Sequence, residues 1–398
     1  MKAIVTNAKN RIAYAVVRCL AKRDIVVVTA DSIPTAMSYF SRYSSAHFIY
    51  PSPYSNEKAF IDEIIMQCKK LKPDVLIPVY EETFVVAKHK KLLSDYVNLF
   101  VPDFDMILAV HDKQNLYKTA EILGIPTPKT IPVSDLEKRP QLVANFSYPV
   151  LIKPRQGGGA WGIEHVASEQ ILNKIISNQA YPGNLPGDRF VVQERISGRV
   201  SCCAILTNQG DYRAGCCYRQ LRETPLTGGT ATYRENIIAP DIMLHFQRLL
   251  KSLNWNGVCQ ADFIIDDVTG KHYLIDVNPR FWGSVFQTII SGVEFPFLVY
   301  QLATGHDFVP INEYSLDCRS RWLWGDLKCF VEFMRNREIR RDINVMDFFK
   351  ISNTDKYDDF ELRDPVPFFM WFADYIYKMI KQKKFHPLPH EEKDDIWE

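Results

Sequence analysis

The chain has 398 residues, of which 46% are hydrophobic and 24% are charged. At about 100–200 residues per domain, this length predicts two or three packed domains. The 48 Lys and Arg residues nearly cancel the 47 Asp and Glu residues, so the net charge is only +1. This balance gives no electrostatic reason to expect a nucleic-acid partner, and it favours an enzyme that acts on small molecules.

The N-terminus has none of the features of an export signal. Met1–Val5 reads as a first β-strand, without a basic head or a long apolar stretch. No uninterrupted apolar run reaches the roughly 18–20 residues that a membrane-spanning helix needs. The nine cysteines are odd in number and lack C-x-x-C spacing, which disfavours a disulfide framework or a zinc site. We therefore expect a cytoplasmic protein with reduced, buried thiols.

Residues 1–105 alternate between apolar strands and helices. The predicted strands are 3–6, 25–29 and 74–79, and the predicted helices are 11–21 and 57–71. This alternation predicts a Rossmann-like domain with a parallel sheet, whose ligands tend to lie at the carboxyl ends of the strands. Glu81 and Glu82 fall there and could hold a substrate amine, or they could simply open a helix. The first turn has no glycine, so a dinucleotide fingerprint is absent.

A glycine-rich loop follows the helical stretch that starts at residue 106. The strand 150–152 ends at Lys153, and Gly157, Gly158, Gly159 and Gly162 come directly after it. Such a turn lets backbone N–H groups approach phosphate oxygens, and the lysine supplies a fixed positive charge. A flexible hairpin with a surface lysine is the alternative interpretation.

A later hairpin carries the residues expected to bind a metal. Asp262 lies on its first strand, and Asp276 and Asn278 lie two residues apart on its second, so all three can point from one face. Two carboxylates and an amide oxygen suit Mg²⁺, or Mn²⁺ in its place. Arg280, two residues further on, could hold the oxygens of a transferring phosphoryl group. The alternative is a solvated hairpin face.

The order of these segments resembles the ATP-grasp superfamily over roughly residues 1–310. It runs from Lys113 through Lys153 with its glycine loop and residues 193–196 to Asp262 and the D-V-N-P-R segment 276–280. Residues 222–229 and 278–284 look most like the carbamoyl-phosphate-synthase-like carboxylate–amine ligase branch. The resemblance implies an ATP-grasp domain over 106–310, with a lid subdomain (106–190) and a catalytic subdomain (191–310).

The resemblance also implies roles for individual residues. Lys113, Lys153 and the glycine loop would hold the phosphates of ATP, and Asp262, Asp276 and Asn278 would bind Mg²⁺. The adenine would lie against a hinge formed by Gln193, Glu194, Arg195 and Ile196. Arg280 would steady the acyl phosphate, and Arg219 and Arg222 would face the γ-phosphate and the acceptor, near Gly228 and Gly229. For Arg219 and Arg222, the alternative is a strand edge guarded by long side chains.

The expected activity is an ATP- and Mg²⁺-dependent ligation of a small-molecule carboxylate and an amine. Another ATP-grasp chemistry, such as phosphorylation of bicarbonate with a partner subunit, and a non-catalytic nucleotide-binding regulator remain as alternatives. Residues 311–398 predict a helical extension rich in aromatic and basic residues. Its packing against the ligase core or a twin subunit, as in a homodimer, is favoured over contact with a membrane surface.

Overall fold

The computed structural model describes residues 1–157, 162–226, 228–335, 344–350, 352 and 354–382. Gly158 and Gly159 of the predicted phosphate loop lie outside these residues. Within the described ranges, no helix has both the length and the apolar character needed to cross a bilayer. All nine cysteines are buried.

The N-terminal region is built on a four-stranded parallel sheet in the order β3-β2-β1-β4. Its strands are β1 (Lys2–Val5), β2 (Val26–Asp31), β3 (Ala46–Ile49) and β4 (Val75–Ile77). Its helices are α1 (Arg11–Ala21), η1 (Met37–Phe40), α2 (Glu57–Leu71), α3 (Glu82–Lys88) and α4 (Lys90–Leu93). Asn10 and Asn56 cap α1 and α2 by accepting backbone N–H groups. The predicted parallel sheet is confirmed.

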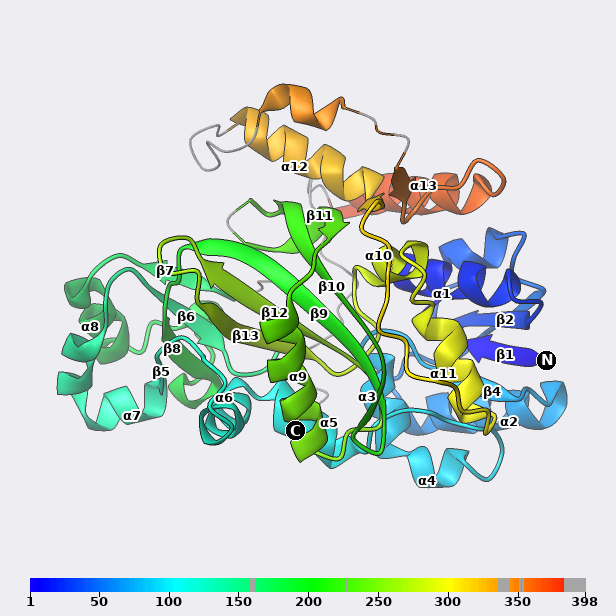
Figure 1. Cartoon of the computed structure of the whole chain (residues 1–398), viewed down its shortest axis with the longest axis horizontal. Coiled ribbons are helices and arrows are strands. Elements are labelled where there is room, and N and C mark those ends of the chain that lie inside the picture. Colours follow the sequence, from blue (N-terminus) through cyan, green and yellow to red (C-terminus); the bar gives the residue numbers. More distant parts are fainter. Residues whose placement is uncertain (158–161, 227, 336–343, 351, 353, 383–398) are drawn as a thin grey trace.

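Two helices lead from this domain to a separate lid sheet, α5 (Phe104–His111) and α6 (Lys113–Ile122). The lid sheet is antiparallel, with strands β5 (Thr130–Pro132), β8 (Phe190–Glu194), β6 (Val150–Pro154) and β7 (Glu164–Val166) in that order. Its helices are α7 (Val133–Lys138), η2 (Pro140–Asn145), α8 (Glu169–Ser177), η3 (Pro182–Asn184) and η4 (Gly187–Arg189). Because β8 pairs with β5 and β6, this sheet runs on to Glu194, past the predicted boundary at residue 190. Figure 1 shows the lid at the far end from the N-terminal domain.

A seven-stranded sheet forms the centre of the molecule, in the order β13-β12-β9-β10-β11-β14-β15. Its first five strands along the chain are β9 (Gly198–Asn208), β10 (Asp211–Thr224), β11 (Thr230–Asn236), β12 (Gly257–Asp266) and β13 (His272–Asn278). The accompanying helices are α9 (Pro240–Ser252), α10 (Val285–Ile290) and α11 (Phe295–Ala303). Val16 of α1 shares one apolar core with Cys202, Trp282 and Phe295. This shared core fixes the N-terminal domain against the central sheet.

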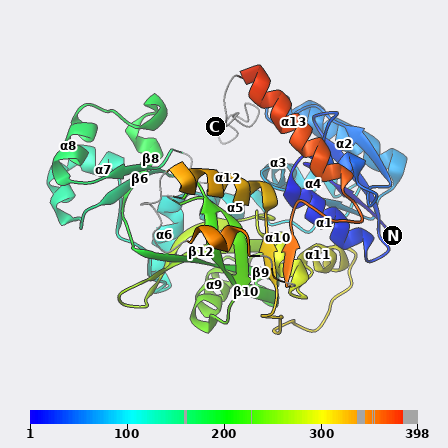
Figure 2. The same cartoon turned by 90° about the horizontal axis from the view of Figure 1, so that it is seen from above.

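The extension is only partly helical, which corrects the prediction for residues 311–398. It contains helices α12 (Leu323–Arg335), η5 (Val345–Phe348) and α13 (Val366–Gln382), and also strands β14 (Arg319–Arg321) and β15 (Asp355–Tyr357). The two strands lengthen the central sheet beyond β11. Strand β14 thereby pairs with the backbone groups that β11 would otherwise expose at an edge of the sheet. Figures 1 and 2 show α12 over the central sheet and α13 beside the N-terminal domain.

Candidate active site

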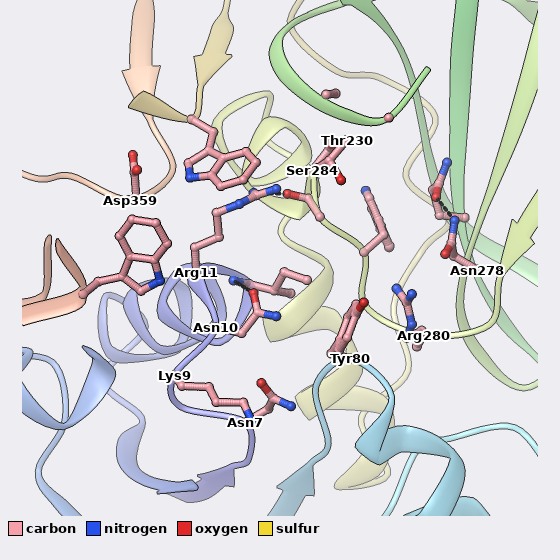
Figure 3. A pocket seen from close by; sticks show the side chains of 18 of the residues that line it. Asn7, Lys9, Asn10, Arg11, Tyr80, Thr230, Asn278, Arg280, Ser284 and Asp359 are labelled. Atoms are coloured by element: carbon pink, nitrogen blue, oxygen red, sulfur yellow. Dashed lines mark hydrogen bonds between the residues drawn. The ribbon is translucent and has the colours of Figure 1, made fainter. Parts of the chain in front are cut away.

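A cavity of about 500 Å³ lies where the N-terminal domain, the central sheet and the extension meet. This volume is within the range of small-molecule sites. In Figure 3, Asn278 and Arg280 lie at one end of this cavity, and Arg11 and Asp359 lie toward the other. We refer to these as the hairpin end and the extension end.

The hairpin end gathers the three predicted metal ligands. In the antiparallel pairing of β12 with β13, Asp262 is opposite Asp276, and Gln260 is opposite Asn278. All four residues line the cavity, as expected from the two-residue period of a strand. Asn278 donates from Nδ2 to Oε1 of Gln260 at 2.8 Å, which leaves its own Oδ1 as the atom that could bind a cation. No group of three His, Cys, Asp or Glu side chains suited to a metal occurs within the described ranges, so this site would depend on the asparagine.

Asp262 lies in a polar network below the hairpin surface. Its Oδ1 accepts hydrogen bonds from Gln260 Nε2 at 2.7 Å and from the thiol of Cys202 at 3.0 Å. Burial raises the pKa of Asp262 to about 6, and the hydrogen bond from Cys202 opposes this rise. The nearby charge of Asp276 adds to the rise in the pKa. A divalent cation at this position would relieve the repulsion between the two carboxylates.

Two buried lysines approach Asp276 from the lid side. Lys113 opens α6 and places Nζ 3.3 Å from a carboxylate oxygen of Asp276. Lys153, at the end of β6, is only 7% exposed and donates to Oε1 of Gln193 at 2.7 Å. Burial and, to a lesser extent, the charge of Lys113 lower the pKa of Lys153 to about 8. A surface lysine on a flexible hairpin is therefore the wrong interpretation of Lys153.

The described part of the glycine loop connects to the same lysines. Gly157 has a φ of +110°, which side-chain-bearing residues rarely adopt, and its carbonyl accepts a hydrogen bond from Lys113 Nζ at 3.1 Å. Gly162 also has a positive φ, of +67°. The predicted hinge begins in β8 with Gln193 and Glu194, and Arg195 and Ile196 follow the strand. The structure thus places the start of the loop, the hinge and both lysines on one side of Asp276.

Arg280 links the hairpin end to the N-terminal domain. Its Nη2 lies 2.8 Å from Oε1 of Glu81, and its guanidinium carbon lies 4.3 Å from the centre of the Tyr80 ring. Arg280 is 7% exposed and lines the cavity. Glu81 therefore contacts the predicted catalytic arginine, whereas Glu82 points into the N-terminal domain, is fully buried and accepts from Tyr50 at 2.8 Å. Glu82 is the first residue of α3, so it belongs to a helix start and does not contact a substrate in the cavity.

Arg219 and Arg222 are not in the cavity. The guanidinium of Arg219 lies 2.6 Å from Glu235, and that of Arg222 makes two hydrogen bonds of 2.7 and 2.6 Å with Asp326 of α12. The side chain that reaches the cavity from this part of β10 is Gln220. Neighbouring residues on a strand face opposite sides, and a β-bulge shifts the register after Gln220, so both arginines point elsewhere. Both guanidiniums are paired with carboxylates, so their predicted contact with the γ-phosphate and the acceptor stays a prediction.

The cavity also has residues that the sequence did not single out. The first turn of the N-terminal domain contributes Lys9, Asn10 and Arg11, and Asn7 lies beside them at the end of β1 (Figure 3). Gly229 lines the cavity next to Thr230, whereas Gly228 does not. The extension adds six more, at Trp322, Lys328, Asp359, Trp371, Asp374 and Tyr375. Only the placement of Asn7 at a strand end gave a signal, because strand ends collect ligands.

The fold and the site together define the class of protein. A lid sheet with a buried lysine faces a larger antiparallel sheet that presents paired carboxylates, and a Rossmann-like domain closes the side of the cavity.

The comparisons with known proteins identify this class. Residues 110–284 match the family model of the ATP-grasp domain. A pyruvate carboxylase of Komagataella pastoris is 25% identical over 268 residues, which are 63% of this chain but only 22% of that protein. The biotin carboxylase domain of a 2-oxoglutarate carboxylase of Hydrogenobacter thermophilus, solved as a dimer with MgADP, has a TM-score of 0.62 at 17% identity. It covers 80% of this chain and 73% of that one.

A crystal structure of an L-amino acid ligase of Bacillus licheniformis has a TM-score of 0.58 at 17% identity, over 76% of this chain and 74% of that one. These likenesses establish the fold. Residues 110–284 therefore match an ATP-grasp domain, as the resemblance of the motifs predicted.

Proposed function

We propose that this protein is an ATP- and Mg²⁺-dependent ligase that activates a carboxylate as an acyl phosphate and joins it to an amine. One observation carries the proposal: the predicted metal ligands and Arg280 meet at one end of a cavity of about 500 Å³, which leaves room for a substrate at its far end. Lys113 reaches Asp276 from the opposite side and connects this end to the lid.

The donor set suits Mg²⁺. Asp262, Asp276 and the Oδ1 oxygen of Asn278 are hard oxygen ligands, and Mg²⁺ usually takes few protein ligands and keeps its remaining positions for water and phosphate. When bound, the ion would neutralise charge on the phosphate oxygens. The raised pKa of Asp262 fits this role, because the cation would replace the proton that burial favours.

The protein side chains would supply position and charge, which are the main demands of phosphoryl transfer. Lys113 and Lys153 would bind the phosphates of ATP. Arg280 would stabilise the negative oxygens of the acyl phosphate and of the intermediate formed when the amine adds. Its ion pair with Glu81 holds the guanidinium in place. The lid would keep water from the acyl phosphate.

The size of the cavity favours an organic acid over bicarbonate. A volume of about 500 Å³ is far more than a four-atom anion needs, and its lining includes several aromatic side chains. One of the structural relatives is an L-amino acid ligase, which supports the proposal of an amine acceptor.

The proposal is tested by measuring ADP release with Mg·ATP and pairs of carboxylic acids and amines, with bicarbonate as a separate substrate. We expect release that requires both an acid and an amine, and a coupled product detected by mass spectrometry. Stimulation by bicarbonate alone, or the same rate from the Asp276→Asn variant as from the wild type, would contradict the proposal.

A further inference from the structure

The extension closes the end of the cavity that lies away from the hairpin. Trp371 and Tyr375 line it from α13, where a separation of four residues puts them on one face of the helix. Trp322 lines it just after β14, and Lys328 lines it from α12. Helix α13 packs on η1 of the N-terminal domain, and Met37 of η1 is also part of the lining. The extension end is thus an enclosed compartment shared by two parts of the chain.

The aromatic rings of this compartment are held in fixed positions. Trp371 and Tyr375 stack with ring centres 5.6 Å apart and planes at 19°. Trp324, behind them, packs edge-on against both rings at 5.7 and 4.9 Å. The guanidinium of Arg11 lies 4.3 Å above the ring of Trp322 and is itself paired with Asp358 at 2.8 Å. Packing of this kind favours a planar ligand, because the walls need not rearrange to receive it.

Several polar groups on the cavity wall are left without a partner. Trp282 is 2% exposed, and its Nε1 donor has no acceptor among the residues described. Asn7 is 1% exposed, and neither its Nδ2 nor its Oδ1 has a hydrogen-bond partner among the described residues. Buried polar groups of this kind are satisfied by water or by a ligand, so these atoms are available to a molecule in the cavity.

The extension end contains one ammonium group, Lys328, and two carboxylates, Asp359 and Asp374. The ammonium of Lys328 lies 4.6 Å from the centre of the Tyr375 ring, and no ion pair joins it to a described carboxylate. Asp359 accepts hydrogen bonds from the backbone N–H groups of Leu323 and Trp324, so it already caps the start of α12. Lys328 can therefore donate a hydrogen bond to a ligand, whereas Asp359 is already occupied; burial lowers the pKa of Lys328 to about 8, so its amine can donate in either protonation state.

We propose that this compartment binds the aromatic ring of the acid substrate, so that the enzyme activates a ring-bearing carboxylic acid. The substrate carboxylate lies toward Arg280, and the ring lies beside Trp282 and against Trp371 and Tyr375. Lys328 then faces a hydrogen-bond acceptor or an anionic group on the ring. The inference rests on the proposed ligase function for the orientation of the acid, and it names the substrate class that the function leaves open.

Calorimetric binding to the full chain in the presence of Mg·ADP tests this inference without turnover. The probes are L-phenylalanine, L-tyrosine and L-tryptophan, with L-leucine and L-alanine as non-aromatic acids. We expect at least one aromatic acid to bind about tenfold or more tightly than leucine. Trp371→Ala should remove this preference, and Trp371→Phe should keep part of it. Phe369→Ala is the matched control, because Phe369 lies on α13, is 60% exposed and is not part of the lining.

Equal binding of leucine and the aromatic acids, or an unchanged preference in a folded Trp371→Ala variant, overturns the inference. Binding of tryptamine in place of the acids also overturns it, because a cation would then be the ligand. Amine-dependent ADP release with non-aromatic acids alone leaves the ligase intact and removes the aromatic compartment. Preferential binding of aromatic acids without any amine-dependent ADP release supports the compartment and contradicts the ligase.

Discussion

Arg280 and Glu81 are 199 residues apart in the chain, yet one Glu81 oxygen accepts from Nε of Arg280 at 3.0 Å and lies 2.8 Å from its Nη2. The pair joins the segment after β13 to the start of α3. The ion pair favours the charged form of Arg280. Together with a hydrogen bond of 3.2 Å from Nη1 to the carbonyl of Phe281, it fixes the guanidinium at the cavity wall. The N-terminal domain thereby positions the residue proposed to stabilise the acyl phosphate.

Arg280→Lys should lower the rate of ligation while leaving ATP binding nearly unchanged. A lysine keeps the charge but loses the planar fork that can hold two oxygens, and a lost oxyanion contact typically costs about 10²–10³-fold in kcat. Steady-state ADP release and nucleotide calorimetry measure the two effects. Glu81→Gln should lower kcat by less, because it loosens Arg280 without removing it. An Arg280→Lys enzyme with wild-type kcat would refute the role of the arginine.

Asp276→Asn should raise the Mg²⁺ concentration required for half-maximal turnover. The substitution keeps the shape of the side chain but removes a charged ligand. Mutating a residue that only hydrogen-bonds to a metal ligand already lowers metal affinity by about 10–100-fold, so losing the ligand itself should cost at least as much. The measurement is ADP release against Mg²⁺ concentration at saturating ATP. Asp267→Asn is the control, because Asp267 is exposed in the turn of the same hairpin. Equal Mg²⁺ dependence in both variants is incompatible with a metal site on β12 and β13.

Lys153→Met should weaken ATP binding strongly with little effect on folding. The lysine is buried and its partner is the Gln193 amide, so its charge is not needed to balance a carboxylate in direct contact. ATP and ADP affinities from calorimetry give the effect, and thermal unfolding without nucleotide checks the fold. Lys174→Met on α8 of the lid is the matched control, because Lys174 is exposed. Identical nucleotide affinity in the two variants would rule out phosphate binding by Lys153.

The Arg222–Asp326 pair should stabilise the fold and not the nucleotide complex. Both side chains are nearly buried, and removing one partner of a buried pair typically costs about 3–5 kcal/mol; we expect Arg222→Met to cost less than this, because Arg321 lies 3.5 Å from the same carboxylate. Arg219→Met, on the same strand, should cost only about 0–1 kcal/mol, because its side chain is 43% exposed. Urea unfolding measures both values. A selective loss of ATP affinity in Arg222→Met, with unchanged stability, would support its predicted role.

The buried carboxyl group of Glu82 should make stability fall as pH rises. Burial raises the pKa of Glu82 from its ordinary value of 4.5 to about 8, and the nearby charge of Asp31 adds to the rise. Between these two values the folded chain holds a proton that the unfolded chain has lost. The free energy of unfolding therefore decreases with pH, by at most about 1.4 kcal/mol per pH unit from this group.

Glu82→Gln should flatten this pH dependence, because a neutral amide imitates the protonated acid and can still bond with Tyr50. Urea unfolding from pH 5 to pH 8 measures the slope. Asp62→Asn, an exposed position on α2, should leave the slope as in the wild type. If Glu82→Gln and the wild type lose stability in parallel, Glu82 does not hold the proton.

The sequence by itself determined the local structure and the order of the site motifs. Residues 11–21 and 57–71 form the predicted helices α1 and α2 at those bounds, because an asparagine cap and an apolar stripe are local features. The spacing of Asp262, Asp276 and Asn278 placed them on one hairpin face for the same reason: a strand alternates with a period of two.

Only the tertiary structure decided which distant side chains meet. The pairing of Arg222 with Asp326, and the strands β14 and β15, depend on how the extension docks, and no local pattern encodes that contact. The same docking brings Trp371 within reach of a cavity whose other end is formed by Arg280. Long-range contacts depend on the complementarity of whole surfaces, so the hairpin end could be predicted from the chain, whereas the extension end could not.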